Sequence, residues 1–216
     1  MKFSLVVFDW DGTLMDSTHS IVVAMQNAAR DLNLTVPSHQ DASWVIGITL
    51  VDALKRVIPD LTDDLVDDFV TRYKYHFLTR DPDLRLFPGN LQLLDELKSK
   101  GTQMAVATGK SRVGLDRALA NHQLGHFFDA TRTSDETASK PDPLMLNEIM
   151  EELMVEPENV VMIGDTTHDI LLAKNAGVHC VAVTYGAHSK QELYEAKPDH
   201  VVESVDELHR LLSIYC

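Results

Sequence analysis

The chain has 216 residues, of which 44% are hydrophobic, enough to form the core of one domain or of one domain with a smaller insert. Its formal net charge of -14 opposes nonspecific binding to nucleic acid or to an anionic membrane surface. The apolar runs are too short to cross a bilayer, and the first residues show no signal-peptide layout, so we expect a cytoplasmic protein. Cys180 and Cys216 lack metal-ligand or disulfide-framework spacing, which fits a reducing compartment.

The first part of the chain predicts one strand followed only by helices. Residues 3–8, FSLVVF, form an apolar run of strand length. Apolar side chains then recur at helical spacing as far as about residue 82. The expected helical segments are 16–32, a short one that ends at Gly47, 49–58 and 62–77. Helices placed between a first strand and the rest of the chain indicate an inserted helical unit.

From residue 86 onward, strand and helix patterns alternate. The expected strands are 103–108, 127–131, 160–164, 179–183 and 200–202, and the expected helices are 90–99, 112–123, 143–154, 167–176, 189–196 and 204–214. Strict alternation favours a parallel sheet with helices on both faces. We therefore predict an α/β fold: a Rossmann-like core of residues 1–15 and 86–216, and an all-helical cap of residues 16–85.

Polar residues follow several of the apolar runs, where the carboxyl ends of parallel strands would place a ligand site. These residues are Asp9 and Asp11 after the first strand, Thr108, Gly109 and Lys110 after the second, Lys140 before a helix, and Asp165 and Asp169 in "GDTTHD". Gathered in one pocket, they would bring several like charges together. Each pair of like charges about 4 Å apart is unfavourable by about 4 kcal/mol at an effective dielectric of 20.

A phosphate monoester bound with Mg²⁺ would account for this charge pattern. A hard dication and the Lys140 ammonium would offset the repulsion and polarise the phosphoryl group. Asp9 then becomes the nucleophile, and Asp11 is placed to protonate the leaving alkoxide and later to activate water. Asp165 and Asp169 would hold the metal. Thr108 and the backbone near Gly109 would hold the nonbridging oxygens.

The motifs "DWDGT", "ATGK", "KPDP" and "GDTTHD" resemble the four ordered motifs of the haloacid dehalogenase superfamily. The subfamily concerned carries a helical cap after the first strand, and the segments 173–186 and 197–208 are similar to those of phosphoglycolate phosphatase-like members. The resemblance implies a phosphorylated Asp9, Asp11 as general acid/base and, through its carbonyl, as a Mg²⁺ ligand. It also implies phosphate binding by Thr108 and Lys140. Asp165 and Asp169 would complete the metal site.

The cap would act as a lid with hinges near 14–18 and 82–89, and its Gly47 and Thr49 would help to bind the substrate. Several readings stay open. Gly47 is equally acceptable as a simple helix break, and Lys110 as a solvated lysine rather than a substrate ligand. Asp169 could cap a helix or hold a neighbouring group instead of ligating the metal. We expect His168 to be an exposed loop residue.

The function expected from these residues is Mg²⁺-dependent hydrolysis of a small phosphorylated metabolite, with phosphoglycolate as one candidate. A phosphomutase resembling beta-phosphoglucomutase is the alternative, but the cap shows no evident sugar-phosphate residues. Receiver domains of signalling proteins also phosphorylate an aspartate beside Mg²⁺. In those domains the phosphorylated aspartate follows a later strand, so the order of motifs here argues against that class. A monomer or weak homodimer is expected.

Overall fold

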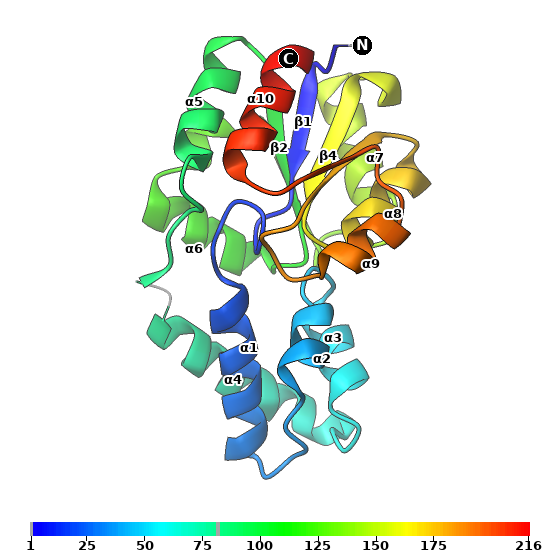
Figure 1. Cartoon of the computed structure of the whole chain (residues 1–216). Coiled ribbons are helices and arrows are strands. Elements are labelled where there is room, and N and C mark those ends of the chain that lie inside the picture. The colour runs from blue at the N-terminus through cyan, green and yellow to red at the C-terminus, as the bar shows by residue number, and fades with distance from the viewer. Residues whose placement is uncertain (1, 81–82) are drawn as a thin grey trace.

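A computed structural model of the chain describes residues 2–80 and 83–216, and its centre is a six-stranded parallel sheet (Figure 1). The strands are β1 (Leu5–Phe8), β2 (Gln103–Thr108), β3 (Ala130–Thr133), β4 (Val160–Gly164), β5 (His179–Val183) and β6 (His200–Val202). They are ordered β3-β2-β1-β4-β5-β6, the order of a doubly wound Rossmann-like sheet. The predicted α/β fold class is therefore confirmed.

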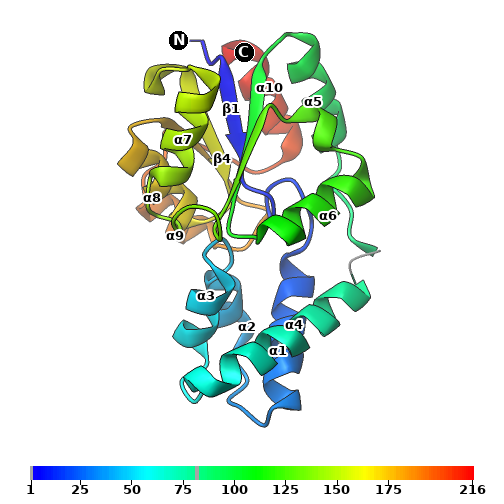
Figure 2. The same cartoon turned by 180° about the vertical axis from the view of Figure 1, so that it is seen from behind.

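Helices cover both faces of the sheet because successive side chains of each strand point to opposite sides. Val6 and Phe8 of β1 belong to one apolar cluster, and Leu5 and Val7 belong to the other. The first cluster includes α5 (Asn90–Ser99), α6 (Arg112–His122) and α10 (Val205–Tyr215), and the second includes α7 (Leu144–Leu153), α8 (Thr167–Ala176) and α9 (Lys190–Glu195). Figures 1 and 2 show the two helical layers from opposite sides. Among the described helices, none is long and apolar enough to cross a membrane.

The helices between β1 and α5 form a separate group beyond the carboxyl ends of the strands, toward which β1 points (Figure 1). This helical group consists of α1 (Thr18–Asp31), α2 (His39–Trp44), α3 (Leu50–Val57), a 3-10 turn at Asp63–Leu65 and α4 (Val66–Arg80). Met25 of α1 and Phe69 of α4 are both fully buried within it. The helices expected after the first strand are therefore present.

Two chain segments connect the helical group to the sheet, and they lie side by side. The Asp16 N–H donates to the Arg85 carbonyl at 2.9 Å, and the Phe87 N–H donates to the Leu14 carbonyl at 3.0 Å. The buried Asn90 side chain donates to the carbonyls of Thr13 and Leu14. These bonds keep the loop after β1 next to the chain that returns from the helices. Residue 82, where the second expected hinge begins, lies outside the described residues.

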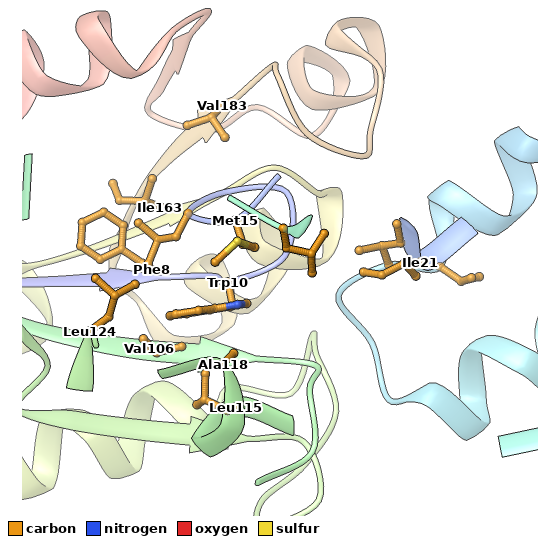
Figure 3. Packing of buried hydrophobic residues seen from close by; sticks show 14 of the residues in the cluster. Phe8, Trp10, Met15, Ile21, Val106, Leu115, Ala118, Leu124, Ile163 and Val183 are labelled. Carbon is orange, nitrogen blue, oxygen red and sulfur yellow. The ribbon is translucent and has the colours of Figure 1, made fainter. Parts of the chain in front are cut away.

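One local expectation changes in the structure. The third strand begins at Ala130 rather than at residue 127, because Gly125–Phe127 forms a 3-10 turn that buries Phe127. Trp10, in the loop after β1, is 1% exposed and packs edge-on against Phe128. Figure 3 shows Trp10 in the apolar cluster beside Val106.

Helix α5 offers a direct test of the packing on the first face. Leu94→Ala, at a fully buried position, should lower the free energy of unfolding by about 2–5 kcal/mol because it leaves a cavity. Leu91→Ala in the same helix, at a position 51% exposed, should change it by no more than about 0.5 kcal/mol. Urea denaturation measures both. Equal losses in the two variants would show that α5 does not pack as described.

Candidate active site

Three carboxylates from distant parts of the sequence meet at the carboxyl ends of β1 and β4. Asp9 follows β1, Asp165 follows β4, and the two strands are parallel neighbours with Phe8 opposite Ile163. Asp169 lies in the first turn of α8. Each of the three offers an oxygen within 4.8 Å of the others, and none is more than 1% exposed. The chain order reverses at this point of the sheet, where doubly wound folds bind their ligands.

Lys140 is the cation that faces this cluster. Its Nζ lies 3.0 Å from Asp9 Oδ1 and 2.7 Å from Asp169 Oδ1, and its side chain is fully buried. The two carboxylates raise the pKa of Lys140 against the effect of burial, so it stays charged. One ammonium among three carboxylates leaves two negative charges in excess if all three are ionised.

The pKa values of the three carboxylates shift in different directions. Burial raises the pKa of Asp9 to about 7, although Lys140 opposes this. Burial also raises the pKa of Asp165, and the nearby Asp9 charge adds to the effect. Burial would raise the pKa of Asp169 as well, but Lys140 and the hydrogen bonds from Thr166 outweigh it, and that pKa is lowered. Protein groups alone therefore do not stabilise the fully ionised cluster.

The Asp9 carboxylate fits a hard divalent cation such as Mg²⁺. Among the described residues, neither of its oxygens has a hydrogen-bond partner, since Lys140 pairs with Asp9 by charge but lies outside hydrogen-bond geometry. A buried carboxylate without such partners is unfavourable unless a cation offsets it. The donors are all carboxylate oxygens, which Mg²⁺ prefers. The residues present thus match the cation that the sequence predicts.

Asp165 is held by loops on both sides of the cluster. Its Oδ1 accepts a hydrogen bond of 2.7 Å from Thr13 Oγ1, and its Oδ2 accepts one of 2.7 Å from the Ala187 N–H. A Cβ at Gly12 or at Gly186 would lie 2.2 Å from Asp165 Oδ2. Both glycines therefore leave room for this carboxylate, and Gly12 also adopts φ +84°, which favours glycine. Gly12 and Thr13 follow the first predicted strand and are expected near the site, whereas no local pattern marks Gly186 or Ala187.

Asp169 caps a helix and also holds Lys140. Its Oδ2 accepts hydrogen bonds from the Thr166 N–H at 3.0 Å and from Thr166 Oγ1 at 2.7 Å, which completes a capping box at the start of α8. Its Oδ1 accepts the hydrogen bond from Lys140. The capping reading left open by the sequence is therefore correct, and direct metal ligation by Asp169 stays a prediction.

Asp11 and Lys110 form an ion pair at the pocket wall. Lys110 Nζ lies 2.9 Å from each Asp11 oxygen, and Ser17 Oγ donates to Asp11 Oδ1 at 2.6 Å. The two side chains are only 10–12% exposed, so the reading of Lys110 as a solvated lysine is wrong. The Lys110 ammonium also lies 4.9 Å from the centre of the Phe77 ring in α4. The ion pair thus fixes the side chain of Asp11 at the pocket wall.

Thr108 and Gly109 place the end of β2 against the helical group. Thr108 is 1% exposed, and its Oγ1 accepts a hydrogen bond of 3.2 Å from the Lys110 N–H. A Cβ at Gly109 would lie 2.5 Å from the Gly47 carbonyl oxygen, so glycine permits the two backbones to approach. Gly47 has φ +100° and lies between α2 and α3.

A cavity of about 530 Å³ lies between the sheet and the helical group. The predicted site residues that line it are Asp9, Asp11, Gly47, Thr49, Thr108, Gly109 and Lys110. Lys140, Asp165 and Asp169 are buried and do not line it, although they contact or adjoin Asp9. Asp9 is therefore the member of the carboxylate cluster that a ligand in the cavity would contact.

Two histidines of the sheet side bind one carbonyl of the helical group. His168 Nε2 lies 3.0 Å and His188 Nε2 lies 2.8 Å from the Trp44 carbonyl oxygen. His188 Nδ1 accepts from the Thr167 N–H, so its Nε2 carries the proton and donates. The His188 ring stacks on the Trp44 ring at 5.6 Å. The expectation that His168 is exposed is wrong: it is 5% exposed because it packs against Trp44.

Known proteins share this fold and these motifs. A family model described as haloacid dehalogenase-like hydrolase matches residues 6–183. The chain belongs to this family. It is 34% identical to "Probable phosphatase IndB" of Dickeya dadantii, covering 97% of the chain and 95% of that protein. It is 30% identical to a phosphoglycolate phosphatase of Vibrio parahaemolyticus, covering 97% and 96% respectively.

A solved structure described as a haloacid dehalogenase-like hydrolase, from Bacteroides fragilis, superposes with a TM-score of 0.87 at 28% identity. It covers 96% of this chain and 100% of the other. The match thus includes the helical group as well as the sheet. The family, together with relatives named as phosphatases, indicates a hydrolase of the phosphatase type. The resemblance that the motifs predict is confirmed.

The role of Gly12 can be separated from the general effect of a left-handed backbone. Gly12→Ala should lower phosphatase activity by about a hundredfold, because the added Cβ displaces the Asp165 carboxylate. Gly101→Ala is the matched control, since Gly101 has φ +76° and nothing lies within 4 Å of its Cβ position. Both variants should lose about 1–2 kcal/mol of stability. Similar activities in the two variants would contradict the crowding at Asp165.

Proposed function

We propose that the protein is a Mg²⁺-dependent phosphatase that hydrolyses a small phosphate monoester through a phosphorylated Asp9. The observation that carries this proposal is the Asp9 carboxylate, which is buried, has no hydrogen bond among the described residues and lines the cavity. A nucleophile needs a lone pair that is not taken up by a hydrogen bond, and Asp9 can use one oxygen to attack phosphorus and the other to hold the metal. Phosphoglycolate, named for one relative, serves as a reference substrate.

Asp9 and Asp165 would hold Mg²⁺ directly, together with the Asp11 carbonyl. Asp169 would add a third negative charge beside the metal, and its hydrogen bond with Lys140 holds that side chain in place. When bound, the metal offsets the excess negative charge and polarises the phosphoryl group as a Lewis acid. The Lys140 ammonium, 3.0 Å from Asp9 Oδ1, favours the ionised form of the attacking carboxylate, and the charge of the metal would add to this effect. Thr108 and the backbone at Gly109 would donate to the nonbridging phosphoryl oxygens.

The reaction would proceed in two transfers. In the first, an Asp9 oxygen forms a bond to phosphorus and the bond to the ester oxygen breaks. Asp11, released from Lys110 and protonated from solvent beforehand, gives its proton to the leaving alkoxide. In the second, Asp11 takes a proton from water, the resulting hydroxide attacks phosphorus, and the Asp9 carboxylate leaves. The products are an alcohol and inorganic phosphate, and both aspartates regain their starting states.

Lys110 would regulate the position of Asp11 between these steps. In the described structure its ammonium contacts both Asp11 oxygens. An entering phosphoryl group would share this ammonium, since Lys110 and Thr108 line the same part of the cavity. Asp11 would then be released toward the ester oxygen. Lys110 thus binds substrate in this proposal, as the sequence predicts.

We further propose that residues 16–85 form the cap domain and that residues 1–15 and 86–216 form the core domain. The cap would exclude bulk water from the phosphorylated Asp9. Contacts of the Gly47 region with Gly109, and of Trp44 with two core histidines, support this arrangement. We propose that it is a cytoplasmic enzyme that acts on small metabolites as a monomer or weak homodimer. The net charge of -14 opposes nucleic acid or anionic membrane partners.

Replacement of the proposed nucleophile gives the most direct test. Asp9→Asn should lower the release of phosphate from p-nitrophenyl phosphate by about a thousandfold or more, because the amide cannot form the phosphorylated intermediate. The fold should persist, since the change removes one charge from a crowded acidic cluster. Circular dichroism and thermal unfolding serve as controls. Wild-type activity in a folded Asp9→Asn variant would exclude Asp9 as the nucleophile.

Binding of the metal can be measured without any turnover. Mg²⁺ should raise the unfolding temperature of the wild-type protein, because a ligand of the native state at about 100 times its dissociation constant adds about 2.7 kcal/mol of stability. Asp165→Asn should abolish the shift. Asp95→Asn, the same change at an exposed position of α5, should retain it. A shift that survives in Asp165→Asn would place the metal elsewhere.

A further inference from the structure

We infer that the alcohol part of the natural substrate is an apolar or aromatic body, and not a second small anion such as the carboxylate of phosphoglycolate. This inference rests on the proposed phosphatase function, since it assigns the end of the cavity at Asp9 and Thr108 to the phosphoryl group. The rest of the cavity then belongs to the leaving group. The side chains that the helical group contributes to the cavity indicate the chemistry of that leaving group.

The wall that the helical group supplies is made of apolar and aromatic side chains from three segments. Ile21 and Met25 come from α1, and Ile46 and Ile48 come from the loop between α2 and α3. Tyr73 and Phe77 come from successive turns of α4, and their rings stack at 6.0 Å with an angle of 16°. Such a surface gains free energy mainly by covering apolar atoms of a ligand, and the Tyr73 hydroxyl is the one polar group among these six side chains.

Charged residues that line the cavity give only a weak positive field for a second anion. Among the described residues that line it, three are acidic and three are basic: Asp9, Asp11 and Asp135, and Lys74, Lys110 and Arg117. Lys110 is bound to both oxygens of Asp11, and Lys74 is exposed. Apart from the groups assigned to the phosphoryl end, Asp135 remains against Lys74 and Arg117, so a second carboxylate would meet an excess of one positive charge at most. Electrostatic attraction between the protein and the substrate would therefore act mainly on the phosphoryl group.

The size of the cavity points to the same class of substrate. Pockets of about 300–1,000 Å³ bury ligands of drug size, and this one measures about 530 Å³. A two-carbon acid would leave much of the apolar wall in contact with water. A ring or a chain of several carbons would displace that water. Each methylene buried in this way should improve binding about fourfold.

Phosphate esters that share a primary alkoxide leaving group test the inference on the wild-type protein. The substrates are methyl, propyl and benzyl phosphate, with phosphoglycolate as the anionic member, all assayed by release of phosphate in the presence of Mg²⁺. We expect kcat/KM to rise along the neutral series, with benzyl phosphate at least about tenfold above methyl phosphate. Phosphoglycolate should fall below benzyl phosphate by a similar factor.

A pair of variants in α4 locates the effect. Phe77→Ala should reduce the ratio of kcat/KM for benzyl over methyl phosphate by about fivefold or more, because it removes part of the aromatic wall. The ratio cancels any change at Lys110, since both substrates carry the same phosphoryl group. Tyr75→Ala is the control, at a position 65% exposed that does not line the cavity. It should keep the wild-type ratio.

The outcomes separate the inference from the function on which it rests. Phosphate release that favours phosphoglycolate over every neutral ester would overturn the inference and leave the phosphatase intact. Loss of that preference in Arg117→Met would then identify the cation responsible. A flat neutral series would overturn the inference as well. Failure to release phosphate from any ester, at Mg²⁺ concentrations that stabilise the fold, would overturn the proposed function itself.

Discussion

The structure of the site depends on a surplus of buried negative charge. Three carboxylates converge where one ammonium, Lys140, is available among the side chains that contact them. Burial of three carboxylates is unfavourable unless a further cation binds to them. The pKa of Asp9 is raised for this reason. The fold therefore maintains a cluster that is incomplete without a cation. That incompleteness makes it suited to bind a metal and a phosphoryl group together.

Backbone geometry keeps this unfavourable cluster in place. The carboxyl ends of β1 and β4 are adjacent, so Asp9 and Asp165 project from one edge of a rigid sheet. Glycines at 12 and 186 leave room for Asp165, and hydrogen bonds from Thr13 and the Ala187 N–H orient it. Lys140 and Asp169 are fully buried and bonded to each other. The sheet and its loops thus supply the stability that the charges themselves do not.

The parts of this site that sequence reasoning could predict are those marked by local pattern. Asp9, Thr108 and Asp165 each follow an apolar run, so their place at the sheet edge could be inferred from periodicity alone. The contacts between distant segments could not. His188 binds a carbonyl 144 residues away, and Thr13 binds Asp165 across 152 residues. The sequence left Lys110 open between a substrate ligand and a solvated lysine, because nothing local shows that Asp11 would meet it.

The hydrogen bonds that residues 44–49 of the helical group form with the core use backbone atoms on the helical side. The Trp44 carbonyl accepts from two histidines, the Gly47 backbone lies against Gly109, and the Thr49 N–H donates to Ser139 Oγ at 3.0 Å. Backbone groups are present whatever the side chain. The side chains between them, Ile46 and Ile48, are then left to line the cavity. Closure and substrate selection are thereby separated within one short loop, so a change in leaving-group preference need not disturb the fit to the charged cluster.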